Sequence, residues 1–244
     1  MVAGRGRLIL VSMSGVALVI GAAARLRTNR GWRQPDGPAD VRFVRALHMA
    51  LRRDMSRLRA AAGQPDRPAS AWTALLAGWD GFQAQLHNHH AAEDDDLWPV
   101  LRRELSDDAD LALVDAMVEE HRHLSPALTG VDQALRGGGE FAAPVERLAT
   151  VLLDHLAREE REVLPLIERY LTWAQWRAFL HKERNRRSPR QRAEFLAWIL
   201  DSADDESAAA VLDEMPPMAR FVHRLFLKPR YERQGRWADQ RHGE

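Results

Sequence analysis

The sequence predicts an all-α fold: an up-down antiparallel four-helix bundle followed by a smaller helical extension. Four long stretches repeat apolar residues at helical spacing, and none of them alternates apolar and polar residues with period two. The breaks between these stretches are short, which favours antiparallel neighbours. We therefore divide the 244 residues into an apolar segment and linker over 1–39, the bundle over 40–171, and a helical extension with its tail over 172–244.

Residues that break helices bound the four long stretches. The first covers about 40–62 and stops at GQPDRP, and the second starts after Ser70, which can cap it, and reaches about residue 105. The third covers about 108–135 and stops at three consecutive glycines, and the fourth covers about 141–171. Prolines inside these patterns should kink or end their helices; they are Pro99, Pro126 and Pro165.

The helical stretches after Thr172 are shorter and rich in aromatic residues. Because these aromatics recur among apolar neighbours, we interpret them as packing residues of the extension rather than as a cofactor site. The last residues, 228–244, are polar and mildly basic and should form an exposed tail. The aromatics concerned are Trp173, Trp176, Phe179, Phe195, Trp198, Phe221 and Phe226.

Residues 8–24, LILVSMSGVALVIGAAA, form an uncharged apolar run with arginines on both sides. Their number is at the lower edge of what spans a bilayer as a helix. A charged start, an apolar middle and small residues at the end also describe a signal peptide. A start placed upstream of the native one is the third interpretation. We expect a cytoplasmic protein, with membrane anchoring or export through residues 8–24 as the alternative.

The composition limits the chemistry. The chain has no cysteine, which excludes disulfides, thiolate nucleophiles, zinc ribbons and iron–sulfur clusters. Lys and Arg together number 35, as do Asp and Glu, so there is no general electrostatic reason to bind nucleic acid, and we expect no such partner. A metal would be held by histidine nitrogen and carboxylate oxygen, which suits iron, manganese or zinc.

A repeated motif indicates a metal site. In HHAAEDDDLWP, Glu93 follows His89 by four residues, and a proline comes six residues later. In HLAREEREVLP, Glu159 follows His155 at the same spacing, and a proline again comes six residues later. Since residues four apart share one face of a helix, each motif presents an imidazole and a carboxylate to the same side.

The other two long helices each offer one histidine at a candidate inward position, His48 and His121. The order along the chain is then His, His-x3-Glu, His, His-x3-Glu, a two-fold pattern that lets a bundle surround two metal ions. One motif alone also arises on solvated helix faces. Four helices contributing together are harder to explain that way, because burying an unpaired charge costs roughly several kcal/mol.

The histidines beside the motifs are predicted to have other roles. His87, two residues before His89, should lie at the surface or support the ligands, and His123 should be exposed. His90 should lie off the metal-binding face, although Asp94 follows it at the same spacing of four. We prefer the pair that starts at His89, because only that pair repeats the spacing to proline. The acids predicted to be solvated are Asp94, Asp95, Asp96, Glu160 and Glu162.

Taken together, these segments resemble the hemerythrin-like (HHE cation-binding) family over about residues 40–171. HHAAEDDDLWP and HLAREEREVLP resemble its two signature segments, LHMALRRDM its first-helix segment and EEHRHL its third. The resemblance implies a non-haem di-iron centre, oxo- or hydroxo-bridged, with manganese or zinc as less favoured metals. It also implies bridging glutamates and capping histidines, and the implied ligands are His48, His89, Glu93, His121, His155 and Glu159.

The sequence departs from the oxygen-carrying members of that family. Those members have His-x3-His on the third helix, whereas the residue four after His121 is Ser125. Their fourth-helix motif is His-x4-Asp, whereas here the residue five after His155 is Glu160 and Glu159 is the better candidate. One nitrogen ligand is therefore missing unless another histidine, His87 or His123, supplies it.

Fewer protein ligands leave more positions open to water, oxygen, peroxide or nitric oxide. This favours sensing or redox chemistry over simple reversible oxygen carriage. Two further functions stay open: a di-iron oxidoreductase acting on peroxide or nitric oxide, and an iron-responsive regulatory module. The sequence does not identify a redox partner.

Overall fold

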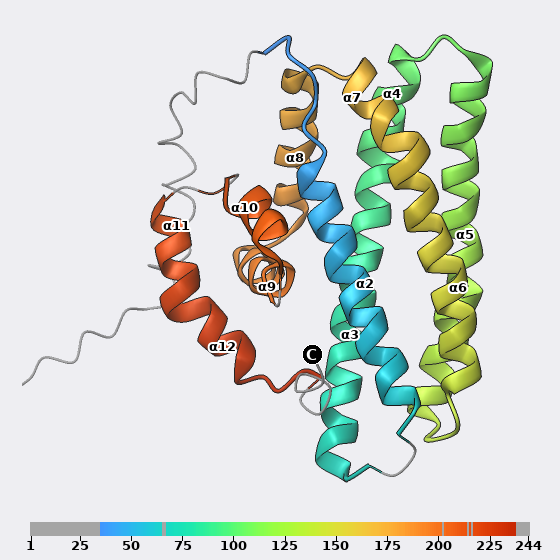
Figure 1. Ribbon diagram of the computed structural model, residues 1–244, viewed down its shortest axis with the longest axis vertical. Coiled ribbons are helices and arrows are strands. Elements are labelled where there is room, and N and C mark those ends of the chain that lie inside the picture. The colour runs from blue at the N-terminus through green and yellow to red at the C-terminus, as the bar shows by residue number, and fades with distance from the viewer. Residues whose placement is uncertain (1–34, 65–66, 202, 214, 216, 238–244) are drawn as a thin grey trace, which may run out of the picture.

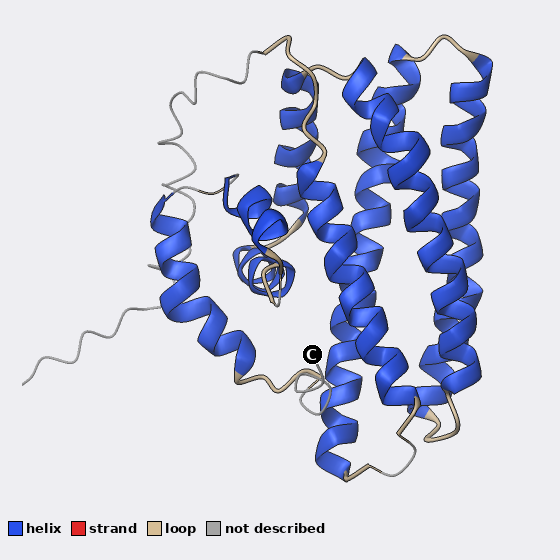
Figure 2. Ribbon diagram, viewed as in Figure 1, coloured by secondary structure: helices blue, strands red, loops and turns tan. Residues whose placement is uncertain are grey.

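The computed structural model of the chain is built from helices, and the residues it describes contain no strand (Figure 1, Figure 2). The predicted all-α class is confirmed. None of the described helices is long and apolar enough to cross a membrane, and the predicted apolar segment over 8–24 lies outside the described residues. The described residues are 35–64, 67–201, 203–213, 215 and 217–237.

Four antiparallel rods form the bundle, running alternately down and up in Figure 1. Each rod packs against two others, since α2 and α5 both contact α3 and α6. The predicted up-down bundle is therefore confirmed. The rods are α2 (Arg42–Ala62); α3 (Ala69–Ala92), η1 (Glu93–Leu97) and α4 (Trp98–Glu104); α5 (Asp108–Arg136); and α6 (Ala142–Arg158), η2 (Glu159–Val163) and α7 (Leu164–Tyr170).

The ends of the rods follow from local chemistry. The Asp107 carboxylate caps α5 by accepting hydrogen bonds from two backbone N–H groups of its first turn. The same helix stops at the three glycines, where Gly138 has φ +67°, a conformation that costs glycine little. The expected cap at Ser70 is wrong: α3 begins one residue earlier, after Pro68, with no side-chain cap.

The second and fourth rods widen into π-helices where the two motifs lie. η1 begins at Glu93 and η2 at Glu159, and six residues later come Pro99 and Pro165. A proline ring clashes with the carbonyl four residues before it. In each rod the residue just before the proline donates its N–H five residues back, to the motif glutamate, and this wider turn gives the ring room. Pro126, by contrast, lies inside the continuous helix α5.

Two hydrophobic clusters fill the interior of the bundle, one toward each end. On α5, Met117 belongs to one cluster and Leu124 to the other. On the fourth rod, Leu156 and Val163 divide in the same way. The motif residues lie between the two clusters, so apolar side chains shield them from both ends of the bundle.

The extension packs beside α2, away from α5 and α6 (Figure 1). α9 and α10 contact α2, and α8 contacts η1. The chain then returns to α3, where the Trp237 ring lies against Gly78 and leaves no room for a Cβ there. The predicted exposed tail over 228–244 is therefore wrong in its described part, because Tyr231 and Trp237 are buried. The extension comprises α8 (Trp173–Arg186), α9 (Pro189–Ile199), α10 (Asp205–Asp213), α11 (Pro217–Val222), η3 (His223–Leu227) and α12 (Lys228–Glu232).

Most aromatic residues of the extension pack as predicted, and Trp176 and Trp198 are fully buried. The prediction is wrong for Phe221 and Phe226, which are exposed. Both lie on the outermost helix, whose other face packs on α9. Apolar spacing alone could not distinguish the inward face from the outward one.

Candidate metal centre

Seven histidine and glutamate side chains from all four rods converge in the gap between the two hydrophobic clusters. They form two groups, and within each group the candidate ligand atoms lie within 4.8 Å of one another. All six residues predicted from the sequence are brought together, with one addition. The first group is His48, His89, Glu93 and Glu159, and the second is His90, His121 and His155.

Glu93, the first residue of η1, lies between the groups and is only 1% exposed. Its Oε1 is 3.3 Å from His89 Nδ1, and its Oε2 is 3.6 Å from His121 Nε2. Burial, and then the charge of Glu159, raise the pKa of Glu93 well above its usual value. Proton binding and cation binding therefore compete at this carboxyl group.

Glu159 occupies the equivalent position at the start of η2. Its Oε2 is 3.3 Å from His48 Nε2 and 3.9 Å from His155 Nε2. Burial acts to raise the pKa of Glu159, but His48 and then His155 outweigh it and hold the pKa at about 2. Each glutamate thus faces one histidine of each group, which is the placement that a carboxylate bridging two cations requires.

Three of the histidines are held from behind by carboxylates. A carboxylate accepts a hydrogen bond from the Nδ1–H of each ring, which leaves the Nε2 lone pair facing the interior. The ring orientation that a metal ligand needs is therefore set before any metal binds. The pairs are His48 with Glu160 at 2.8 Å, His121 with Asp94 at 2.9 Å, and His155 with Glu120 at 2.9 Å.

The prediction that Asp96 is solvated is wrong, because its side chain is only 14% exposed and is paired with Arg186. The prediction is also wrong for Asp94 and Glu160. Their side chains are only 34% and 23% exposed, and each orients a histidine of another rod. Each directly follows a motif glutamate, so the repeated pair of acids was the signal in the sequence. Arg52 anchors Glu160 from outside at 2.6 Å, and an arginine at position 158 does the same for Glu120.

His90 does not lie off the metal-binding face, as the sequence had suggested. Its ring stacks on that of His121 with centroids 3.9 Å apart, and its Nε2 is buried. Adjacent helical residues differ in direction by about 100°. The direction from α3 to the bundle interior lies between the directions of the His89 and His90 side chains, so both can reach the interior. His89 therefore faces His48, with their Nε2 atoms 3.2 Å apart, while His90 faces the second group.

The fifth candidate nitrogen ligand is thus His90. The two histidines proposed to compensate for Ser125 are outside the groups: His87 is exposed, and the His123 side chain is 68% exposed. The second group therefore contains three histidines and the first contains two.

Burial makes most of these imidazoles suitable as neutral ligands. It is the main cause that lowers the pKa of His89 and His90 well below the usual 6.5, and it also lowers the pKa of His155. His48 differs. Burial acts to lower its pKa, but the neighbouring Glu159 and Glu160 outweigh that effect and raise it.

Several inward-facing atoms of the two groups are buried without a hydrogen-bond partner in the described residues. Leaving such an atom unpaired costs about 1–3 kcal/mol, so their concentration at one place favours an external cation as the partner. Nitrogen and carboxylate oxygen donors without sulfur fit iron, manganese or zinc. The atoms are Nε2 of His90, His121 and His155, Oε2 of Glu93, and both carboxylate oxygens of Glu159.

The fold and this site define a helical bundle built to hold metal cations. The family model for the hemerythrin HHE cation binding domain matches residues 39–167, more than half of the chain. The chain therefore belongs to the hemerythrin HHE cation-binding domain family. A search of curated proteins and a search of solved structures each find no match.

Proposed function

We propose that the two groups hold a non-haem di-iron centre and that this centre binds or senses oxygen, nitric oxide or peroxide. The observation that carries the proposal is the pair of glutamates, Glu93 and Glu159, each facing a histidine of both groups. Bound iron would supply a redox-active site for a small oxidant or for nitric oxide.

The residues of the chain would hold and shield this centre. The outer carboxylates fix the proton of His48, His121 and His155 on Nδ1, and the two hydrophobic clusters exclude bulk water. The first group has two histidines and the second has three. Because each glutamate faces both groups, a small exogenous ligand would meet one histidine fewer on the side of His48 and His89, and we propose that it binds there.

Metal analysis and an optical spectrum of aerobically purified protein test the proposal. We expect about two irons per chain with oxo-to-iron charge-transfer bands. Glu93→Ala and Glu159→Ala should each lower the iron content. Glu119→Ala removes an exposed carboxylate of α5 that is paired with Arg122, and it should leave the iron content unchanged. Zinc or manganese retained in place of iron, or equal losses in the control, would contradict the proposal.

The reaction with small ligands separates the functions. Resonance Raman spectra of the oxygenated protein should show no bands of a stable terminal hydroperoxide. Such bands together with slow autoxidation would indicate an oxygen carrier instead. Steady-state consumption of peroxide or nitric oxide would indicate the oxidoreductase.

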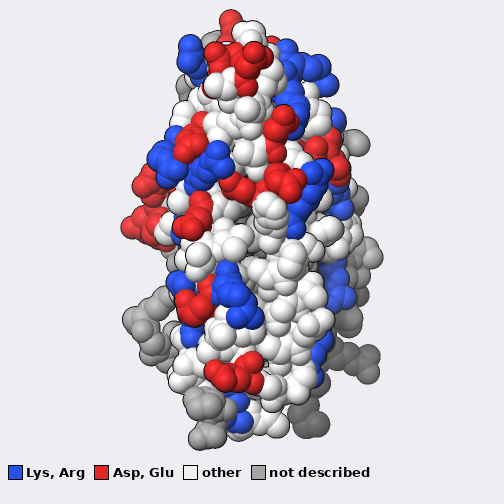
Figure 3. Space-filling model, turned by 90° about the vertical axis from the view of Figure 1, so that its right-hand side faces the viewer, with Lys and Arg blue, Asp and Glu red and all other residues white. Residues whose placement is uncertain are grey.

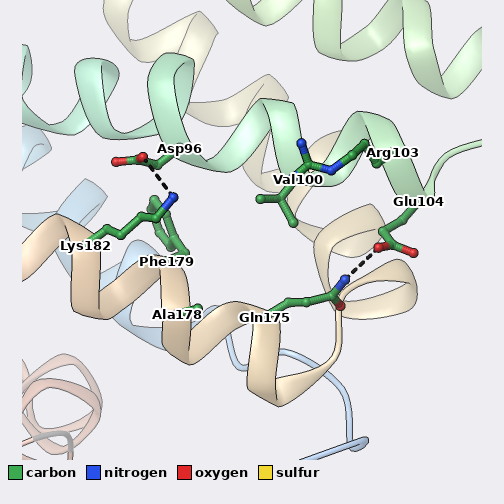
Figure 4. A pocket seen from close by; sticks show the side chains of 8 residues that line it. All are labelled: Asp96, Val100, Arg103, Glu104, Gln175, Ala178, Phe179 and Lys182. Atoms are coloured by element: carbon green, nitrogen blue, oxygen red, sulfur yellow. Dashed lines mark hydrogen bonds and ion pairs between the residues drawn. The ribbon is translucent and has the colours of Figure 1, made fainter.

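One observation favours the regulatory alternative. Helix α8 of the extension is bonded to η1, the segment that begins with Glu93. Arg186 Nη2 lies 2.7 Å from Asp96, and Lys182 Nζ lies 3.5 Å from it. Figure 4 shows the ion pair between Lys182 and Asp96 beside a pocket between α8 and the second rod. The volume of this pocket is about 200 Å³. If the extension responds to the metal, iron should change protease sensitivity beyond Thr172, and Arg186→Ala should weaken that change.

A further inference from the structure

The outermost helix of the extension exposes an apolar row. Four large hydrophobic side chains are exposed in the described part of the chain, and three of them lie within six residues of one another. They are Phe221 at 58%, Leu225 at 50% and Phe226 at 55%. The fourth, Met49, lies alone on α2. Exposed apolar residues that gather in this way mark a surface that contacts something else.

The opposite face of this helix attaches it to the protein. α11, η3 and α12 follow one another without a break from 217 to 232, and Val222 and Tyr231 on the inner face are buried. η3 and α12 contact α9. The helix therefore already packs on the protein through another face, and the exposed apolar row is a second apolar face.

The same helix is strongly basic. Residues 217–233 include five Lys or Arg and one acid, Glu232, in a chain whose formal net charge is zero. Arg224 and Lys228 are exposed and alternate with the apolar row along the helix. The face made by α5 and α6 is different, because acidic and basic side chains are mixed on it (Figure 3).

We propose that the outer face of α11, η3 and α12 docks on an anionic lipid bilayer. Phe221, Leu225 and Phe226 would enter the boundary between headgroups and acyl chains, while the basic residues contact lipid phosphates. This proposal is independent of the metal centre.

Charge complementarity favours an anionic bilayer over a second copy of the chain and over the apolar run of residues 8–24. Two copies of the chain meeting through this face would bring like charges together. The apolar run over 8–24 of the same chain carries no acid and has arginines on both sides, so it offers nothing to the basic residues. An anionic bilayer offers both an apolar layer and negative charge.

Co-sedimentation of the full chain with lipid vesicles tests this proposal. We expect stronger binding to vesicles of equal parts phosphatidylglycerol and phosphatidylcholine than to phosphatidylcholine alone, and weaker binding at high salt. Arg224→Gln with Lys228→Gln should reduce affinity by about 10- to 30-fold. Replacing the three apolar residues of the row by serine should reduce it at least as much. Met49→Ser and Arg122→Gln, at exposed sites elsewhere, should have no effect.

Hydrogen exchange distinguishes this surface from the apolar run over 8–24. Amide exchange at residues 220–230 should slow when anionic vesicles are added. Unchanged exchange there, or full vesicle binding by both sets of variants, would overturn the proposal. So would self-association of the chain that the same variants abolish, because the occupant would then be a second copy. Unchanged helical content and melting temperature verify that the variants fold.

Discussion

Helix α2 contributes to two buried polar clusters, which differ in how the charge of their carboxylates is neutralised. Around His48, Oε2 of Glu93 and both carboxylate oxygens of Glu159 are buried and lack a hydrogen-bond partner of normal geometry among the described residues. Around Asp54, six residues further on, both carboxylate oxygens accept hydrogen bonds. Oδ1 accepts from Arg53 Nε at 3.0 Å, and Oδ2 accepts from Trp198 Nε1 at 2.7 Å.

The group that neutralises a buried carboxylate indicates whether the carboxylate supports the fold or binds a cation. Asp54 is neutralised by guanidinium groups of its own chain, and its bond to Trp198 attaches the extension to α2. In the metal centre the arginines stop one layer further out, where Arg52 binds Glu160 rather than an inward glutamate. The carboxylate of the first cluster is already balanced by arginines of the chain, whereas no arginine reaches the inward glutamates of the second.

Removing Asp54 should produce the largest loss of stability. Asp54→Ala leaves the buried guanidinium group of Arg53 without its carboxylate and removes the acceptor of the Trp198 Nε1–H, which costs about 3–5 kcal/mol. Urea unfolding measures this free energy. The matched control is Asp115→Ala, which breaks an exposed pair with Arg102 and should cost about 0–1 kcal/mol. Metal content per folded chain should not change in either variant, and a loss in Asp54→Ala would mean that the two clusters are not independent.

The opposite pattern is expected for His90. His90→Ala removes a candidate ligand of the second group, so metal affinity should fall by more than the roughly 10- to 100-fold typical of outer partners. The stability of the metal-free protein should hardly change. His87→Ala, three positions earlier on the same helix and exposed, is the control. Equal affinity of the wild-type protein and His90→Ala would remove this residue from the centre.

The outer carboxylates should have intermediate effects. Glu160→Gln keeps the size of the side chain but weakens the hold on the His48 ring, and metal affinity should fall about 10- to 100-fold. Glu119→Gln is the control, because that exposed carboxylate pairs with Arg122 and His123, which lie outside both groups. Metal titration of both variants measures the difference, and identical affinities would contradict a role for Glu160 in orienting the ring.

Local features of the sequence predicted the bundle and six of the seven residues in the two groups. Spacing within one helix is fixed by its geometry, so Glu93 and Glu159 follow from their histidines. The inward direction of α3 is set by its packing against other rods, so a periodic pattern placed His90 wrongly. Tertiary partners leave no local trace at all: Asp54 and Trp198 are 144 residues apart.

The smallest expected effect is a dependence of metal affinity on pH. The pKa of Glu93 is raised, chiefly by burial, and that of His48 is raised by its two carboxylate neighbours. A raised pKa stabilises the metal-free fold at low pH, and this contribution is lost as the pH rises through the folded-state pKa. A cation displaces both protons, so metal affinity should still be rising with pH past the ordinary pKa values, 4.5 for Glu93 and 6.5 for His48, and should level off above the raised ones.

Each displaced proton changes the affinity by up to about tenfold per pH unit. His89, His90 and His155 have lowered pKa values, so they are already neutral at pH 7 and release nothing. Anaerobic calorimetric titration with ferrous iron, in two buffers of different ionisation enthalpy, counts the protons released. Glu160→Gln should release fewer at pH 7, because it removes one cause of the raised pKa of His48. Metal binding without proton release at pH 7 would show that Glu93 and His48 are already deprotonated in the metal-free protein. The metal centre would then hold its buried charge without a cation, as the Asp54 cluster does.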